Sequence, residues 1–390
     1  MNSWECRPIG DLIKTTKTWS PLRAGSDETF QYIDLSAVDQ DKKEIVGVRE
    51  VACCEAPSRA RQLVETNDVL VSTVRPNLNG VAKITADLSD ATASTGFCVL
   101  RPVTNVLDSN YLFHWVKSPQ FVSDMVKKAT GASYPAVSAR IVLASSIPYP
   151  PIPEQCRIAA ILDEADALRT KRREVLTQLD SLTQSIFIEM FGDPVVNPKG
   201  WQKDKMGNLL RIRRGGSPRP IEQFLGGTIN WIKIGDATKG DDIYITRCAD
   251  KITEGGLKKT VFLKAGSLIF ANCGVSLGFA RILKVDGCIH DGWLSLEEIQ
   301  DNKLDKLFLL KALNALTTRF RKMAPDGTQP NLNTDLMKNF QMILPPMSLQ
   351  HQFAAKFDII ESLKSTQRQS LTELDALFAS LQHRAFRGEL

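Results

Sequence analysis

Two clusters of basic and amide side chains in the first half of the chain have the chemistry to contact DNA. Segments 72–79 and 127–134 both combine positive charge with hydrogen-bonding groups. Lysine and arginine neutralise phosphates, whereas arginine, asparagine, glutamine and serine can hydrogen-bond the edges of bases. The residues predicted to contact DNA in this half are Arg75, Asn77, Asn79, Lys127, Lys128, Ser133 and Tyr134.

The second half of the chain repeats this combination in two segments and adds uncharged hydrogen-bonding side chains in a third. The densest is 211–219, which holds four arginines, and the others are 270–277 and 319–331. One such cluster alone is more often an ordinary solvated surface, so the recurrence in both halves is what favours DNA binding. The residues predicted to contact DNA here are Arg211, Arg213, Arg214, Arg219, Asn272, Ser276, Gln329 and Asn331.

The motifs that would indicate an enzyme fail on their context. Segment 163–166 spells the DEAD box of helicases, but it lies inside a helical pattern and no phosphate-binding GxxxxGK[ST] loop exists in the sequence. We therefore interpret these acidic residues as solvated helix positions. The Asn/Asp-Pro-Pro-aromatic tetrad of adenine methyltransferases and a GxSxG nucleophile elbow are also absent. No catalytic residue is predicted.

The composition is that of a globular protein with two or three domains: 390 residues, 43% hydrophobic and 24% charged. A net charge of +5 permits a polyanionic partner without requiring one. The sequence predicts neither a membrane-spanning helix nor a secretory signal. The eight cysteines form no CxxC pair, so no metal site is predicted. Cys53 and Cys54 are expected to be unpaired thiols in a reducing cytoplasm.

The chain is a tandem repeat with an offset of 195 residues, half of its length. Without gaps, 15 of the 42 positions from 150 to 191 are identical to the positions 195 residues later. The similarity continues upstream with small shifts, for example from Ser20-Pro21 to Ser217-Pro218. Because this period is far longer than that of a solenoid, the sequence predicts two copies of one domain-sized module.

Each copy begins with a globular part of mixed pattern, at 1–150 and 196–345. Short β-branched runs alternate there with Gly, Pro and Asn, which predicts a small, irregular, mainly β globule with a few helices. Helical pieces are expected near 110–129 and 304–322. The clearest predicted strands are 69–74, 81–84, 268–271 and 279–283.

Each copy ends with a long helical segment, at 153–191 and 348–386. Apolar residues recur there at alternating steps of three and four without an internal break. About 35 helical residues span roughly 50 Å, which is too long for one small globule to cover, so we expect the two helices to pack on each other. Antiparallel order follows because two head-to-tail copies close most simply about a pseudo-two-fold axis. The residues predicted to pair are Ile158, Leu168, Leu179, Leu182 and Ile186 with Leu381, Leu377, Leu374, Leu363 and Phe353.

One loop differs between the copies although the strand ends beside it agree. When 68–84 is aligned with 266–282, the strands share four residues, whereas 72–79 and 270–277 share none. A common scaffold with divergent loops is expected of two modules that recognise different targets, although drift in an unimportant loop gives the same pattern. The shared pairs are Leu70/Leu268, Gly80/Gly278, Ala82/Ala280 and Ile84/Ile282.

This layout resembles the specificity (S) subunits of type I restriction-modification systems. The resemblance rests on PPIPEQCRIAAILDEAD and LPPMSLQHQFAAKFD, on DVLVSTVRPNLNGVAKI and GSLIFANCGVSLGFARI, and on the terminal HRAFRGEL. It implies an α+β fold: a tandem repeat of two mixed, mainly β target recognition domains, each followed by a long helix, with the helices paired as an antiparallel coiled coil. The implied regions are target recognition domain 1 at 1–150, spacer helix 1 at 151–192, target recognition domain 2 at 193–345 and spacer helix 2 at 346–390.

The resemblance also implies a cytoplasmic, non-catalytic DNA-binding subunit of a restriction system. Each target recognition domain would recognise half of a bipartite, asymmetric site, and the coiled coil would set the gap. The implied partners are double-stranded DNA, two methyltransferase (M) subunits and restriction (R) subunits, with no membrane. S-adenosylmethionine, ATP and Mg would belong to those partners, and no cofactor is expected in this chain. Two alternatives stay open: the specificity subunit of a two-sided cutting type II system, and a coiled-coil adaptor that does not bind DNA.

Overall fold

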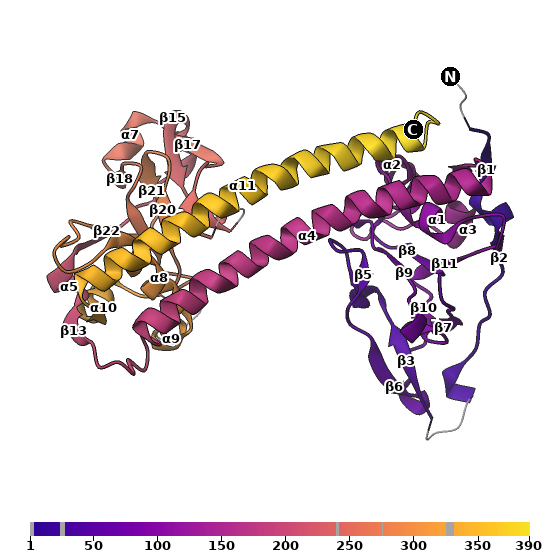
Figure 1. The fold of residues 1–390 in the computed structure, drawn as a ribbon. Helices are drawn as coiled ribbons and strands as arrows, with labels where there is room; N and C mark the ends of the chain where they lie inside the picture. The colour runs from indigo at the N-terminus through magenta and orange to yellow at the C-terminus, as the bar shows by residue number, and fades with distance from the viewer. Residues whose placement is uncertain (1–3, 24–27, 239–241, 275, 325–330) are drawn as a thin grey trace. The chain divides into compact units, whose positions relative to one another are not determined.

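The computed structural model describes residues 4–23, 28–238, 242–274, 276–324 and 331–390. The chain divides into two compact units. Unit 1 comprises 1–174 and 368–390, and unit 2 comprises 175–367. Each unit therefore holds one globule, the first half of the long helix that follows it and the second half of the other long helix (Figure 1).

The globule of unit 1 is built on two four-stranded sheets with strand orders β6-β3-β10-β7 and β2-β11-β8-β9. Short helices follow the last strand of the second sheet. The strands are β1 (Cys6–Pro8), β2 (Ile13–Lys14), β3 (Thr29–Ile33), β4 (Val38–Asp39), β5 (Glu44–Ile45), β6 (Arg49–Ala52), β7 (Ala60–Leu63), β8 (Val69–Ser72), β9 (Val81–Lys83), β10 (Thr92–Ser94), β11 (Phe97–Pro102) and β12 (Ser146–Pro148). The helices are α1 (Ser109–Val116), α2 (Pro119–Lys128) and α3 (Ala139–Leu143).

The globule of unit 2 repeats this plan with the orders β17-β15-β21-β18 and β14-β22-β19-β20-β16. Its strands are β13 (Gln202–Lys205), β14 (Arg211–Arg214), β15 (Leu225–Ile232), β16 (Tyr244–Ile245), β17 (Asp250–Ile252), β18 (Val261–Leu263), β19 (Leu268–Ala271), β20 (Ala280–Leu283), β21 (Gly287–Ile289), β22 (Trp293–Glu297) and β23 (Gln341–Leu344). Its helices are α5 (Met206–Leu209), α6 (Ile234–Ala237), α7 (Glu254–Leu257), α8 (Lys306–Ala315), α9 (Thr317–Met323) and α10 (Thr334–Asn339).

The two sheets of one globule match the two sheets of the other strand for strand, and β16 is the additional edge strand of unit 2. The pair β1-β12, which joins the two ends of the first globule, likewise corresponds to β13-β23 in the second. The repeat predicted from sequence is therefore a repeat of topology, and the α+β fold class is confirmed.

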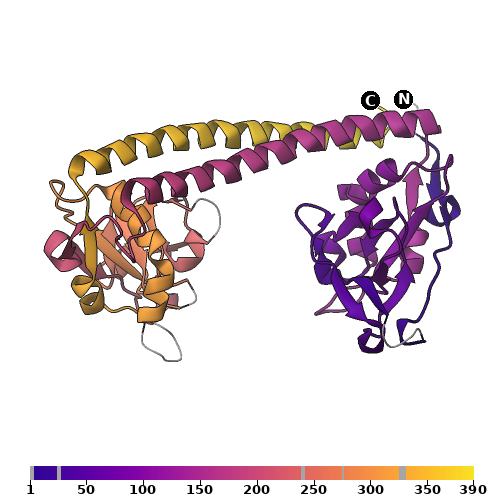
Figure 2. The ribbon, with the colours of Figure 1, turned by 60° about the horizontal axis from the view of Figure 1, so that its bottom comes forward.

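The two predicted long helices are α4 (Ile152–Phe191) and α11 (Met347–Ala385). At 1.5 Å per residue, α4 is about 60 Å long. In each unit a half of α4 lies alongside a half of α11, in antiparallel order (Figures 1 and 2). In unit 1, Arg157 bonds to Leu390 and Arg169 bonds to Asp375. In unit 2, Asp180 binds Lys364, and Phe187 contacts Phe353.

Four of the leucines predicted to pair lie beside the buried seam rather than in it. The exposed fraction of the residue is 46% for Leu168, 45% for Leu182, 48% for Leu363 and 49% for Leu377. The positions directly after them turn inward instead, at Arg169, Thr183, Lys364 and Phe378. At Arg169, Thr183 and Lys364 the seam position holds a polar side chain, so apolar periodicity skips it and selects the neighbouring leucine. Phe378 is apolar, and there the pattern offers two adjacent apolar residues.

The remaining predicted pairing residues lie on the buried stripe. Ile158 and Phe353 are almost fully buried, at 0% and 1% exposed. The half-buried ones are Leu179, Ile186, Leu374 and Leu381.

Two of the three acidic residues of segment 163–166, which were interpreted as solvated helix positions, instead bind side chains of the globule. Asp163 binds the buried His114 at 2.7 Å, and Asp166 binds Lys117 at 2.6 Å. These contacts attach the helix to α1 of its own globule. Lys117 and Arg169 hold the pKa of Asp166 below its usual value although burial opposes this.

A buried glutamine fastens the start of each long helix to the globule before it. The amide of Gln155 accepts from the Asp108 N–H at 2.9 Å and donates to the carbonyls of Val106 and Pro150. Gln350 makes the same set of bonds in unit 2, with the Asp305 N–H at 2.8 Å and two carbonyls. Both side chains are fully buried. Each amide thus satisfies three backbone groups that would otherwise be buried without a partner.

We expect Gln155→Leu to destabilise unit 1 by about 2–4 kcal/mol, because it leaves buried backbone groups unsatisfied while filling the same space. Gln350→Leu should do the same to unit 2. Hydrogen exchange measured by mass spectrometry separates the two, since faster exchange should be confined to one unit in each variant. The exposed Gln178→Leu on α4 is the matched control and should change stability by less than about 0.5 kcal/mol. Equal effects of all three variants would contradict this role.

Candidate nucleic-acid interface

Three loops meet at one residue, Thr73, in the globule of unit 1. The N–H of Thr73 donates to the Gly96 carbonyl at 2.9 Å, and its own carbonyl accepts the N–H of Val137 at 2.9 Å. The Thr73 hydroxyl adds a second bond to Gly96 at 2.8 Å. The β8–β9 loop, the β10–β11 loop and segment 130–137 are therefore held together. We call this arrangement the three-loop junction of unit 1.

Unit 2 has the same three-loop junction around Asn272. The N–H of Asn272 donates to the Gly292 carbonyl at 3.0 Å, and its carbonyl accepts the N–H of Leu332 at 2.8 Å. Its side-chain amide donates to Asn331 Oδ1 at 3.0 Å. The backbone bonds are those of Thr73, so the two junctions share a scaffold although their side chains differ.

These bonds correct the alignment of the loops by one residue. Ser72 donates to Gly80 in unit 1, and Ala271 donates to Phe279 in unit 2. The offset across strands and loop is therefore 199, whereas the sequence comparison used 198. A one-residue slip exchanges the two faces of a strand, so the four shared residues at the old offset are not equivalent. At the correct offset Leu78 and Leu277 are identical in the loop.

Four of the residues predicted in unit 1 are exposed at or beside the junction. Arg75 lies over the ring of Tyr134, with 4.7 Å from Cζ to the ring centroid, and Tyr134 is 69% exposed. Asn77 and Ser133 are exposed in the same two loops. The structure thus brings together two clusters that are more than 50 residues apart in sequence.

The other three predicted residues of unit 1 differ in whether their polar groups already have partners within the globule. Lys127 is exposed at the end of α2, while Lys128 is paired with Asp124 at 2.7 Å. Asn79 is a loop-anchoring residue: its amide donates to the Lys117 carbonyl at 3.4 Å and its carbonyl accepts from Lys43 at 2.6 Å. Its side-chain nitrogen and its backbone carbonyl are therefore committed within the globule.

The arginine cluster of unit 2 lies mostly on a strand, β14, rather than in a loop. Arg213 makes a bidentate pair with Glu297 at 2.8 and 2.6 Å, and Arg211 pairs with Glu298 at 3.0 Å. Glu297 raises the pKa of Arg213 against the opposing effect of burial. Arg214 and Arg219 are exposed beyond them.

The side chain of Asn272, which was predicted to contact DNA, is 0% exposed in this structure. The amide instead ties two loops of the junction together. Asn331 accepts that bond and is half-buried, and Ser276 is half-buried in the same loop. Gln329 lies outside the described residues.

A polar group beside the junction of unit 2 was not predicted from the sequence. Asp291 accepts from the hydroxyl of Ser217 at 2.8 Å, and its carbonyl accepts from Arg214 at 2.9 Å. His290 is adjacent. Burial lowers the pKa of His290, and the positive charges of Arg219, Lys233 and Arg214 lower it further against the effect of Asp291. The available signal was the run of polar residues between two apolar strands, at 290–292.

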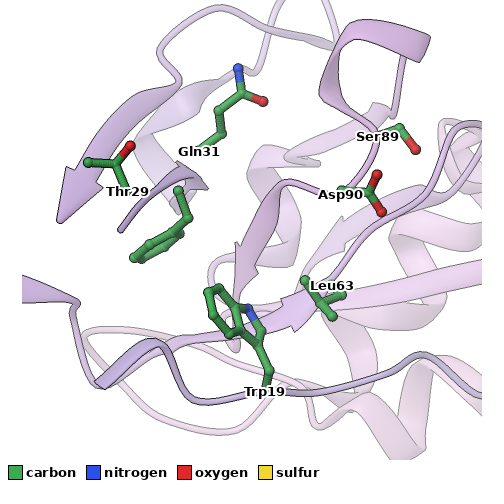
Figure 3. Close-up of a pocket in the computed structure, with 7 residues that line it drawn as sticks. Trp19, Thr29, Gln31, Leu63, Ser89 and Asp90 are labelled. Carbon is green, nitrogen blue, oxygen red and sulfur yellow. The ribbon is translucent and has the colours of Figure 1, made fainter. Parts of the chain in front are cut away.

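An open hollow of about 420 Å³ lies beside β3 in unit 1, away from these residues. Trp19 forms one wall, and its ring meets Phe30 edge-on at 5.6 Å. Figure 3 shows Gln31 and Asp90 at its rim. None of the predicted DNA-contacting residues lines it.

The sequence profile of one protein family, described as the type I restriction modification DNA specificity domain, matches residues 1–178 and again 198–375. The chain belongs to this family. The two matches correspond to the two modules of the repeat, and the recognition of a type I specificity subunit from sequence is confirmed.

Relatives and solved structures of type I specificity subunits agree with this family. The HindI specificity subunit of Haemophilus influenzae is 21% identical, over 100% of both chains. The MjaIX specificity subunit of Methanocaldococcus jannaschii is 25% identical, over 71% of this chain and 68% of that one. A chain from a structural study of assembly and conformational transition of the type I R-M system is 25% identical, with a TM-score of 0.64 over 100% of this chain and 99% of that one.

This specificity subunit therefore functions in sequence-specific DNA recognition within a type I restriction-modification system, and the type II and adaptor alternatives are not favoured. All eight cysteines are free thiols. Among the described residues, no helix is long and apolar enough to span a membrane.

Arg213 and Arg214 are adjacent on β14 but should behave differently. We expect Arg213→Ala to lower the free energy of unfolding by about 1 kcal/mol, because it breaks a bidentate but partly exposed ion pair. Arg214→Ala should leave stability within about 0.5 kcal/mol and weaken DNA binding. Urea unfolding and filter binding to DNA separate the two effects. Loss of DNA binding in Arg213→Ala without loss of stability would contradict the assignment.

Proposed function

We propose that each unit recognises one half of a bipartite, asymmetric DNA site through its three-loop junction. The chain itself supplies no catalysis. Two methyltransferase subunits modify the site, and restriction subunits cleave the DNA. The observation that carries this proposal is the pair of junctions that share a backbone and differ in side chains.

In both units the backbone bonds that hold the junction are distinct from the exposed side chains that can contact DNA. Thr73 and Asn272 make the same two backbone bonds, so both junctions hold their loops on a common backbone framework. The exposed groups differ: Arg75 stacked on Tyr134 in unit 1, and Arg214 beside Asp291 in unit 2. Donor and acceptor groups placed on one scaffold in different patterns select different bases. The two units are therefore expected to recognise half-sites of different sequence.

The long helices are suited to set the unread gap because both ends of each one are anchored. The first half of each is fastened by its buried glutamine, Gln155 or Gln350. The far end of α4 packs its Phe191 against Phe308 of unit 2, and Phe386, directly after the far end of α11, packs against Tyr111 of unit 1. The number of residues between these anchors is therefore fixed by the chain.

We expect duplication of one heptad in both helices, 176–182 in α4 and 371–377 in α11, to widen the gap by about three base pairs. Seven residues add about 10 Å of helix, and each base pair occupies 3.4 Å. Whole heptads keep the seam in phase. The measurement is methylation mapping of a genome that carries this chain with its methyltransferase partner. Both half-site sequences should stay the same.

Duplication in α4 alone is the matched control, because it puts the two anchors out of register and should abolish methylation. An unchanged gap in the double duplication would exclude the helices as the spacer. Methylation of a single continuous site by the unmodified chain would exclude the bipartite proposal itself.

The methyltransferase subunits are proposed to dock on the leucine pairs beside the seam. In unit 1, Leu168 and Leu377 each directly precede an inward-facing position, so in an antiparallel pair they flank the same side. Leu182 and Leu363 have the same relation in unit 2. All four are about half exposed. One apolar pair in each unit matches two copies of an apolar partner helix.

We expect Leu168→Lys combined with Leu377→Lys to remove one of two methyltransferase subunits, because charge on an apolar docking face prevents burial. Native mass spectrometry should show the ratio of methyltransferase to this chain falling from two to one. Thr170→Lys with Ala379→Lys adds the same charge at exposed positions on the same helices and should keep the ratio of two. A ratio of two in the leucine variant would refute this docking surface.

A further inference from the structure

We propose that Arg75 recognises a guanine in the half-site bound by unit 1, and that Tyr134 holds its guanidinium in place. This inference rests on the proposed function and names one base contact within it.

The backbone at Arg75 is the first observation. Its φ of 51° and ψ of 62° lie in the left-handed region, which is unfavourable for a residue with a side chain. The equivalent position in unit 2, at the offset of 199, is Gly274, with φ of 71°. The loop therefore requires a left-handed residue here. Glycine meets this requirement without strain, whereas unit 1 keeps an arginine.

A second left-handed position in the same loop supports the comparison. Asn79 has φ of 47°, and its equivalent Gly278 has φ of 104°. Asparagine is among the side chains that tolerate this region, and Asn79 also bonds to Lys117 and Lys43. Arginine is not among the side chains that tolerate the left-handed region, and no hydrogen bond of its side chain within the described residues explains why Arg75 is kept there. A side chain retained at a strained position is a candidate for function.

The surroundings hold Arg75 in one orientation. Its N–H donates to the Pro135 carbonyl at 2.7 Å, and Val74 forms a bridge with Ala136. The guanidinium then lies on the ring of Tyr134, which is 69% exposed. Within the described part of the chain, the guanidinium has no hydrogen-bond or ion-pair partner. Its donors are thus both free and oriented.

A guanidinium in this state matches guanine better than any other base. Its planar fork donates two parallel hydrogen bonds, and only guanine presents two acceptors, O6 and N7, in the major groove. Stacking on Tyr134 fixes the plane of the fork before binding, which reduces the entropy lost on contact. A phosphate would accept the same donors without distinguishing bases, so the test must separate these two ligands.

The test measures binding of the full complex with its methyltransferase subunits to duplexes in which each guanine of the first half-site is replaced singly. At one position 7-deazaguanine, which lacks N7, should weaken wild-type binding by about 5- to 150-fold. Inosine at that position keeps O6 and N7 and should bind like guanine. Arg75→Ala should bind both analogues and guanine equally at that position, with recognition of the second half-site unchanged.

Matched variants separate the roles of the two residues. Arg75→Lys should also lose the discrimination, since lysine lacks the fork. Tyr134→Phe keeps the ring and should behave like the wild type, whereas Tyr134→Ala should lose part of the discrimination. Arg75→Gly should lose it entirely yet unfold at a temperature no lower than the wild type, because the strain is relieved.

A phosphate contact would give a different pattern and overturn the proposal. Arg75→Lys would then keep sequence preference, and Arg75→Ala would weaken all duplexes alike and reduce the salt slope by about one. A lower unfolding temperature in Arg75→Gly, or loss of both half-sites in any variant, would also overturn it. Absence of any bipartite preference in the wild type would instead refute the proposed function.

Discussion

Each unit closes its hydrophobic core with side chains from the far end of the other long helix. In unit 1, Phe378 and Ala385 of α11 and Phe386, which directly follows this helix, join the core of the first globule together with the start of α4. In unit 2, Phe187 and Phe191 of α4 join the core of the second globule with Phe353 and Phe357. Apolar burial of this size is the main source of stability in a domain, so neither globule has a complete core by itself. This shared core holds each globule, and with it the three-loop junction, against the parts of the two long helices in the same unit.

Two ion pairs between the long helices favour one register of α4 against α11. The ion pair of Arg169 with Asp375 in unit 1 is repeated, at the offset of 195, by Lys364 with Asp180 in unit 2, both at 2.6 Å. Although burial alone would lower it, the hydrogen bonds to Asp180 and Glu361 raise the pKa of Lys364. A charged residue on a helix seam stabilises less than an apolar one but tolerates only a register that supplies its partner. We infer that these pairs favour a single register between the anchored helix ends.

The junctions show how one scaffold serves two different recognition surfaces. The bonds of Thr73 and Asn272 are backbone bonds, which do not depend on side-chain identity, so the exposed residues can differ without loss of the loop conformation. Arg75 illustrates the limit of that freedom. Its position requires a left-handed backbone, and the strain of keeping a side chain there is offset by the bonds around Pro135 and Ala136. Stability and recognition are in conflict at this one residue.

Local pattern was sufficient for much of the fold. The two long helices, the repeat and strand β19 at Leu268–Ala271 follow from periodicity and β-branched runs, which depend on neighbours in sequence. The clustering of segment 72–79 with Tyr134 was not predictable in this way, because it is made by backbone bonds between distant loops.

The amino-acid sequence by itself determined the family, the repeat and the elements, since these depend on residue types at fixed spacing. Only the tertiary structure decided which polar residues face inward. It placed Arg169 and Lys364 on the seam in place of Leu168 and Leu363, and it buried Asn272. It also moved the loop alignment by one residue, because equivalence in a sheet is defined by hydrogen-bond partners rather than by letters. A polar side chain is buried only when a distant partner satisfies it, and the linear sequence does not specify that partner.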